Sequence, residues 1–154
     1  MELDAGQVAG PRYMLLIEDN VSDERLTRRA LQRANILNRL EVVRDGVEAI
    51  DFIYRPSADG GMRELPAVTL LDLKLPRIDG LEVLRRIRED ERTRLMPVVV
   101  MTSSKEEEDI LAAYQLGSNA YLRKPVDVAD FVVAARVLGL SWLLMNEPPP
   151  GVPS

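Results

Sequence analysis

An α/β fold with a parallel sheet covered by helices on both faces is predicted by two features of this sequence. Short apolar runs alternate with segments of helical periodicity five times along the 154 residues, and such alternation is typical of parallel sheets with right-handed crossovers. The run Pro97-Val-Val-Val-Met101 is apolar throughout, as expected for a strand buried on both faces. Without an internal repeat or a linker, we expect a flexible N-terminus over 1–11, one domain over 12–145 and a proline-rich tail over 146–154.

The first half of the chain contains three predicted strands and two predicted helices. Asn20 or Ser22 can cap a helix over 21–34, and a second helix spans 46–54. Apolar residues recur in them at helical spacing: Val21, Leu26, Ala30, Leu31 and Ala34, then Val47, Ile50, Ile53 and Tyr54. The strands are the apolar runs 12–17, 40–43 and 65–71. The loop over 56–66 is either a partner-specific element or a tolerated insertion, and the second interpretation is favoured.

The second half continues the alternation. Ser104 and Glu107 form a capping-box pattern at the start of one helix, and Gly117 can end it. Gly139 weakens the middle of the long last helix. The predicted elements are a helix after the loop 76–80, strands over 97–101 and 119–123, and helices over 104–116 and 127–145.

Composition excludes several kinds of chemistry. The chain has neither cysteine nor histidine, so thiolate or imidazole metal sites and catalytic triads are ruled out within it. The net charge of −5 and the mixing of arginines with acids disfavour binding to nucleic acid or to anionic membranes. No signal peptide and no apolar stretch of the ~20 residues needed to cross a bilayer is present. We therefore expect a cytoplasmic protein.

Three acids follow predicted strands and are candidates for a metal site. Glu18 and Asp19 come directly after the first strand, and Asp72 follows the third. Ligands of such folds bind beyond the carboxyl ends of the strands, where the strand order reverses. An acid after a strand is often only a helix cap or a turn residue, so Glu18 and Asp19 alone leave both interpretations open. With Asp72 added, the pattern favours a pocket for Mg²⁺, which prefers carboxylate oxygens.

Two more strand ends add to this pattern. Thr102 follows the fourth strand and Lys124 follows the fifth. By itself Thr102 would be taken as a cap and Lys124 as a surface residue, so only the combination carries weight. Pro125 favours a cis peptide bond that would direct the lysine inward.

These residues resemble the response-regulator receiver domains of two-component signalling. The matching motifs are Glu18-Asp19, Asp72 within Leu71-Asp-Leu-Lys-Leu-Pro-Arg-Ile-Asp-Gly80, Thr102-Ser103 and Lys124-Pro125. The resemblance covers about residues 12–145 and implies a flavodoxin-like fold with strand order 2-1-3-4-5. The chain is further similar to the single-domain regulators of bacterial phytochrome kinases in the stretches 18–20, 43–49, 51–54, 104–110 and 124–127.

The resemblance implies a role for each residue of the site. Asp72 would accept a phosphoryl group from a histidine of a partner sensor kinase, which agrees with the lack of histidine in this chain. Asp19 and Asp72 would bind Mg²⁺ directly, Glu18 through water, and Lys74 through its backbone carbonyl. The protein would catalyse only its own phosphorylation and dephosphorylation, without turnover of another substrate.

Phosphoryl contacts and switching are also implied. Thr102 and Lys124 would contact phosphoryl oxygens, and Tyr121 would turn inward as Thr102 moves. Without the resemblance, Tyr121 would be taken as a core residue. These movements would change the surface formed by the helix over 104–116, the strand over 119–123 and the last helix. That last helix carries more apolar residues than one buried stripe requires, so we expect a homodimer through this surface, although core packing alone is an alternative.

Two departures and two alternatives accompany this interpretation. Glu18 is longer than aspartate, and Lys74 brings a cation near the pocket. One alternative is an interaction module with the same fold that switches without phosphorylation. The other is a Mg²⁺ phosphohydrolase, but such enzymes usually need a second aspartate two residues after the nucleophile, where this chain has Lys74.

Overall fold

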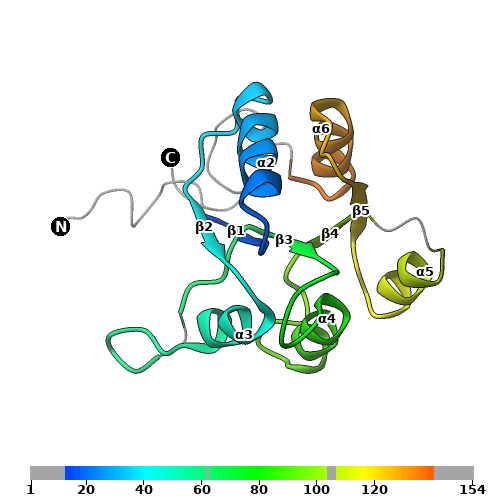
Figure 1. Ribbon diagram of the computed structural model, residues 1–154. Coiled ribbons are helices and arrows are strands. Elements are labelled where there is room, and N and C mark those ends of the chain that lie inside the picture. Colours follow the sequence, from blue (N-terminus) through cyan, green and yellow to red (C-terminus); the bar gives the residue numbers. More distant parts are fainter. Residues whose placement is uncertain (1–12, 62, 104–106, 141–154) are drawn as a thin grey trace.

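A five-stranded parallel sheet forms the centre of the protein. The computed structural model describes residues 13–61, 63–103 and 107–140. The strand order is β2-β1-β3-β4-β5, and all four pairings are parallel, which confirms the predicted fold class (Figure 1). The strands are β1 (Met14–Ile17), β2 (Leu40–Val43), β3 (Val68–Asp72), β4 (Val98–Thr102) and β5 (Ala120–Arg123).

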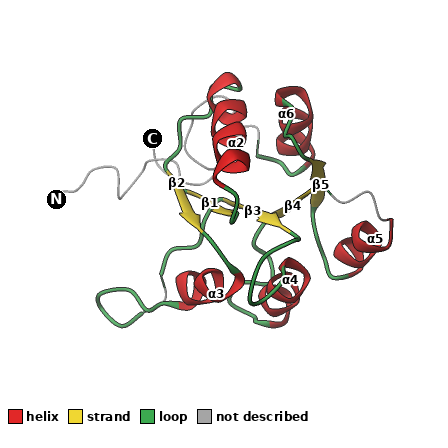
Figure 2. Ribbon diagram, in the orientation of Figure 1, coloured by secondary structure: helices red, strands yellow, loops and turns green. Residues whose placement is uncertain are grey.

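Helices cover both faces of the sheet. Helices α2 and α6 lie on one face, and α3, α4 and α5 lie on the other (Figure 2). Successive residues of β1 belong to separate cores: Leu15 and Ile17 face α3 and α4, whereas Met14 and Leu16 face α2 and α6. The helices are α2 (Val21–Arg33), α3 (Gly46–Tyr54), α4 (Gly80–Glu89), α5 (Glu107–Gln115) and α6 (Val128–Val137).

Polar caps begin four of these helices at the carboxyl edge of the sheet. Asn20 caps α2 by accepting a hydrogen bond from the backbone N–H of Asp23, so Asn20 rather than Ser22 is the cap. The caps of α3, α4 and α6 are aspartates: Asp45, Asp79 and Asp127. Helix N-termini carry partial positive charge, and this edge is therefore favourable for anionic groups.

The strand boundaries differ slightly from those predicted. The third strand begins at Val68 instead of residue 65, because Pro66 has no N–H to contribute to the ladder. It extends through Asp72, whose backbone is in register with Met101 of β4. The fourth strand likewise extends to Thr102, so both polar residues are held by the sheet itself.

The prediction of a last helix over 127–145 is wrong. Helix α6 ends at Val137, and Gly139 adopts a left-handed φ of 73°. The N–H of Gly139 donates to the carbonyl of Arg136, and the N–H of Leu140 donates to that of Ala135, as is typical of a glycine-terminated helix. This turn returns Leu140 to the core beside α6. Residues 141–145, and the predicted cap Ser104 of α5, lie outside the described residues.

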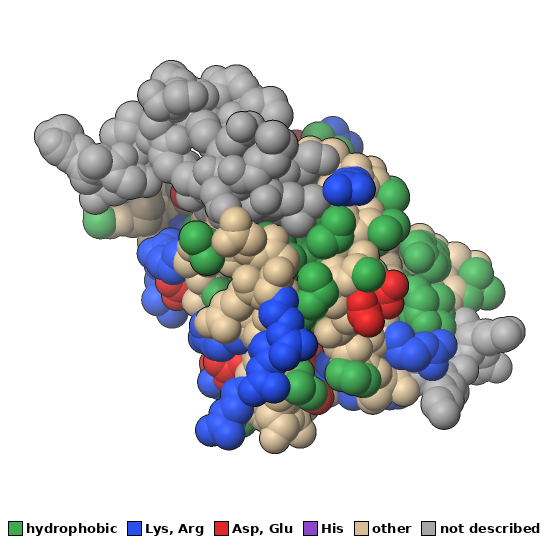
Figure 3. Space-filling model, turned by 90° about the horizontal axis from the view of Figure 1, so that it is seen from above, with side chains coloured by type: hydrophobic (Ala, Val, Ile, Leu, Met, Phe, Trp, Pro, Cys, Tyr) green, Lys and Arg blue, Asp and Glu red, His purple; other side chains and the backbone are tan. Residues whose placement is uncertain are grey.

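The buried face of α2 also differs from the prediction. Val21 and Leu26 are exposed, whereas Glu24 and Thr27 are buried with Ala30. The carboxylate of Glu24 forms ion pairs with two arginines, one on α2 and one after β2, and this pairing permits its burial. Figure 3 shows hydrophobic side chains beside Lys and Arg side chains on the face that carries α2 and α6.

The loop between α3 and β3 closes on itself. Backbone hydrogen bonds join Ser57 to Gly61 and Gly60 to Ser57, and a carboxylate oxygen of Asp59 accepts from the N–H of Gly61. Its turn is thus held by its own residues.

Within the described part of the chain, no helix has the length and apolar character required to cross a membrane.

Candidate functional site

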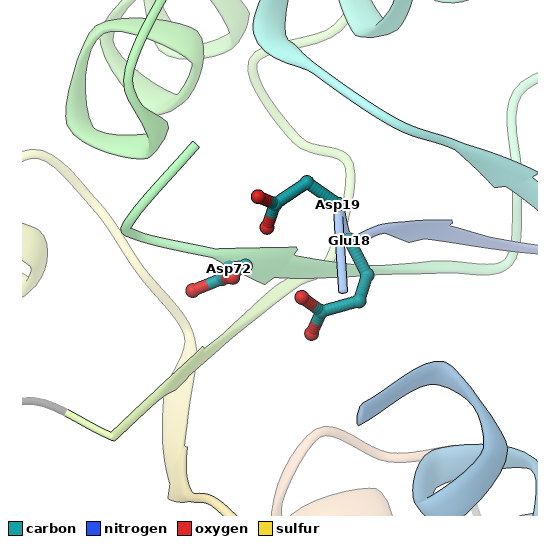
Figure 4. Close-up of side chains that lie close together, drawn as sticks. All are labelled: Glu18, Asp19 and Asp72. Carbon is teal, nitrogen blue, oxygen red and sulfur yellow. The ribbon is translucent and has the colours of Figure 1, made fainter. Parts of the chain in front are cut away.

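Three carboxylates gather where the strand order reverses, between β1 and β3. Glu18, Asp19 and Asp72 each offer an oxygen within 4.8 Å of the others, and we call these residues the acid pocket. Figure 4 shows Glu18 and Asp19 just beyond the end of β1 and Asp72 at the end of β3. Glu18 and Asp72 are buried, whereas Asp19 is exposed. The pocket is therefore open to solvent on the side of Asp19.

The turn after β3 fixes the position of Asp72. One oxygen of Asp72, Oδ1, accepts a hydrogen bond of 3.1 Å from the backbone N–H of Lys74. The chain then folds back, and the N–H of Gly80 donates to the carbonyl of Leu73. A Cβ at position 80 would lie 2.3 Å from the carbonyl oxygen of Asp72, so only glycine permits this approach.

Lys124 enters the acid pocket from the end of β5. Its Nζ lies 2.6 Å from Glu18 Oε1, 3.0 Å from Asp72 Oδ2 and 3.0 Å from Asp23 Oδ2. The Lys124–Pro125 peptide bond is cis. The backbone N–H of Lys124 donates to the carbonyl of Thr102, which places these two strand ends side by side.

The contact with Asp23 is the part of the site that the sequence did not reveal. Asp23 lies in the first turn of α2, where an acid is ordinarily explained by the helix dipole. Its partner Lys124 is 101 residues away in the sequence. The available signal was that α2 begins immediately beyond the predicted acids, so its first turn had to lie beside the pocket.

Burial and charge act in opposite directions on the two central groups. Burial raises the pKa of Glu18 to about 7, although the hydrogen bond from Lys124 opposes this shift. Burial alone would lower the pKa of Lys124, but its contacts with Glu18, Asp23 and Asp72 outweigh it and raise the pKa above its ordinary value. Lys124 is therefore a permanent cation at neutral pH, and it partly neutralises the acids around it.

The other residues predicted for the site are Thr102, Lys74 and Tyr121, and only Thr102 has its side chain buried at the end of a strand beside the pocket. Thr102 is buried at the end of β4, on the pocket edge. The side chain of Lys74 forms an ion pair of 3.2 Å with Asp109 of α5, so its cation is engaged by that helix. Tyr121 is half-buried, accepts a hydrogen bond from Arg123, and lines a groove of about 470 Å³ between α5, β5 and α6.

The donor set and the fold define a class of site. Clustered carboxylates offer the hard oxygen ligands that divalent cations prefer, and a buried lysine beside them offers a contact for an anion. Such a site at the switch point of a doubly wound sheet is suited to a cation and a phosphate-like group together. Residues 14–136 match the response regulator receiver domain, and the chain belongs to this family.

Relatives of similar length support this assignment. The probable methanogenesis regulatory protein FilR2 of Methanothrix harundinacea is 40% identical over 150 residues, which cover 96% of each chain. Response regulator Rcp1 of Synechocystis is 35% identical over 133 residues, covering 86% of this chain and 90% of Rcp1.

Solved structures give the same result. The bacteriophytochrome response regulator RtBRR shares 46% identity and a TM-score of 0.77, covering 92% of this chain and 86% of RtBRR. The Mn²⁺-bound form of Rcp1 shares 34% identity and a TM-score of 0.68, covering 94% of this chain and all of that one (100%). The predicted relationship to the regulators of phytochrome signalling is thereby confirmed.

Proposed function

We propose that this protein is a response regulator that accepts a phosphoryl group on Asp72 from a histidine of a partner sensor kinase. The observation that carries the proposal is the contact of 3.0 Å between Lys124 Nζ and Asp72 Oδ2 inside the acid pocket. A buried carboxylate held between a cation and other acids is a nucleophile whose product, an acyl phosphate, would already have a counter-charge beside it.

The chemistry requires positioning more than covalent machinery. An oxygen of Asp72 forms the new bond to phosphorus while the bond from phosphorus to the histidine nitrogen breaks, and its electron pair stays on the imidazole. The N–H of Lys74 orients Asp72, Lys124 offsets the negative charge of the transferring group, and the hydroxyl of Thr102 donates to a phosphoryl oxygen.

The acid pocket fits Mg²⁺ as the associated cation. Its three carboxylates are hard oxygen donors close enough to share one ion, and the Mn²⁺-bound form of the relative Rcp1 supports a divalent ion. Asp19 and Asp72 would hold Mg²⁺ directly, Glu18 through water, and Lys74 through its carbonyl. When bound, the ion supplies positive charge for the transferring phosphoryl group.

Phosphorylation would be read out through the surface around Tyr121. We define the α5–β5–α6 surface by the exposed or half-buried residues Leu111, Tyr114, Tyr121, Val133 and Val137. In the proposed switch, Thr102 moves toward the phosphoryl group and Tyr121 turns inward, changing the groove that it lines. The exposed apolar residues of this surface favour a homodimer or another protein as its partner.

The kinase partner is proposed from the relatives. RtBRR is a bacteriophytochrome response regulator, so a phytochrome kinase is the favoured donor, and the reaction would take place in the cytoplasm. The protein would act on no substrate other than its own aspartate.

Labelling with a small phosphodonor tests the proposal. Wild-type protein incubated with acetyl phosphate and Mg²⁺ is expected to gain one phosphoryl group by intact mass, whereas Asp72→Asn gains none. Asp130→Asn, which removes an exposed acid from α6, is the matched control and should be labelled like the wild type. Equal labelling of Asp72→Asn would contradict the assignment, and a folded wild type without any label would favour the phosphorylation-independent alternative.

A further inference from the structure

Lys124 is enclosed by carboxylates in the absence of a phosphoryl group, and two of them, Asp23 and Asp72, accept hydrogen bonds from its Nζ. An ammonium group has three N–H donors. Three carboxylates surround the Nζ of Lys124 at 2.6–3.0 Å: Glu18, Asp23 and Asp72. A phosphoryl oxygen that approaches this lysine therefore competes with the carboxylates that already contact it.

The three carboxylates differ in how easily water can replace the lysine. The side chain of Glu18 is 0% exposed and that of Asp72 is 5% exposed, whereas that of Asp23 is 33% exposed. A buried carboxylate that loses its cation bears a large desolvation cost, but a partly exposed one is rehydrated. Asp23 is therefore the partner that Lys124 can leave at the lowest cost.

We propose that Asp23 is a positioning residue that holds Lys124 in the unphosphorylated protein and competes with the phosphoryl group for it. This inference rests on the proposed function, in which Asp72 receives that group. On phosphorylation, Lys124 exchanges Asp23 for a phosphoryl oxygen, while Glu18 keeps its own contact. Asp23 thus weakens the phosphorylated state by retaining the lysine that stabilises it.

The exchange of Asp23 for a phosphoryl oxygen would also change the contacts of the first turn of α2. The backbone N–H of Asp23 donates to the side chain of Asn20, so Asp23 belongs to the capped first turn of that helix. Its ion pair with Lys124 joins this turn to the end of β5. Loss of the ion pair on phosphorylation would uncouple the two elements.

Beryllofluoride, which mimics the phosphoryl group on aspartate, provides the probe. Its affinity is measured by titration calorimetry with saturating Mg²⁺ for the wild type and for Asp23→Asn. The variant is expected to bind beryllofluoride about three- to tenfold more tightly, the effect of releasing one partly exposed ion pair. Asp130→Asn removes the same charge from the first turn of α6 and should bind like the wild type.

Mg²⁺ binding alone separates competition from structural damage. In Asp23→Asn the lysine is left to Glu18 and Asp72, and one nearby negative charge is lost, so affinity for Mg²⁺ should fall while affinity for beryllofluoride rises. Disruption of the pocket would weaken both.

Failure of the wild type to bind beryllofluoride would contradict the proposed function. A wild type that binds, with Asp23→Asn binding equally or more weakly, would overturn only the role of Asp23.

Discussion

Lys124 and Arg88 are both partly buried cations. Lys124 lies at the carboxyl ends of the strands and Arg88 at their amino ends, and the two differ in the kind of partner that surrounds them. At the carboxyl edge, Lys124 contacts three carboxylates. At the other edge, Arg88 donates to the carbonyls of Gly117, Arg94 and Met96 and to the side chain of Asn119, which also accepts from the N–H of Val98.

The partners of Lys124 can be exchanged, whereas those of Arg88 are fixed by the backbone. Carboxylates carry charge and can exchange one cation for another, so the surroundings of Lys124 can admit Mg²⁺ and a phosphoryl group. Backbone carbonyls cannot move without moving the chain, so Arg88 holds the end of α4 against the residues that precede β4 and β5. Burial lowers the pKa of Arg88, whereas the acids around Lys124 raise its pKa.

Removing the lysine should give the largest effect. Lys124→Met leaves Glu18 and Asp72 buried without their cation, and we expect the free energy of unfolding at pH 7 to fall by about 3–5 kcal/mol. Urea denaturation measures this loss, and Mg²⁺ should restore part of it by neutralising the same acids. Lys74→Met, which removes an exposed lysine, should cost less than about 1 kcal/mol. A Lys124→Met protein as stable as that control would show that the acids do not depend on the lysine.

Arg88→Met should destabilise the protein less than Lys124→Met and should leave phosphorylation of Asp72 unchanged. The carbonyls that it leaves are near the surface and can be partly rehydrated, so we expect a loss of about 2–3 kcal/mol. Labelling by acetyl phosphate should stay at the wild-type level. Arg86→Met, from the exposed face of the same helix, serves as the control and should change stability less. Loss of labelling in a folded Arg88→Met protein would mean that the two edges are coupled.

The last expected effect is a dependence of stability on pH caused by Glu18. Its pKa is raised from 4.5 to about 7 in the folded protein, so the folded state binds the proton more tightly than the unfolded state. The resulting stability is present below pH 4.5 and is lost as the pH rises through about 7. This pKa of about 7 already includes the opposing effect of Lys124.

Glu18→Gln isolates this contribution because it lacks the titrating group. Urea denaturation of both proteins without metal, between pH 4.5 and 7, should show the wild type losing stability relative to the variant. A constant difference, or one of the opposite sign, would contradict the raised pKa.

The sequence alone was sufficient to predict the sheet and most of the residues that form the acid pocket. Apolar runs that end in Glu18 and Asp72 mark strands whose carboxyl ends must meet, because parallel strands share one edge. Lys124 was recognised for the same reason. These inferences depend on local pattern and on topology, and both are carried directly by the order of residues.

What the sequence did not predict depends on how helices pack. The contact of Asp23 requires the start of α2 to lie beside the pocket that the side chain of Lys124 enters from β5. Arg88 lies within a series of mixed charges that is typical of a solvated helix, and its carbonyl partners have no signature in the side chains. The end of α6 was missed because the burial of Leu140 favours the turn at Gly139, whereas periodicity alone favours continuing the helix.

The loop of residues 57–61 has a practical consequence. Its hydrogen bonds join its own members, Ser57, Asp59, Gly60 and Gly61, and it lies on the α3 side, away from the α2 side that carries Asp23 (Figure 1). A reporter group inserted there would be attached to a segment whose geometry the rest of the fold does not determine. It would offer a place to mark this regulator while leaving both the lysine and its exchange partners intact.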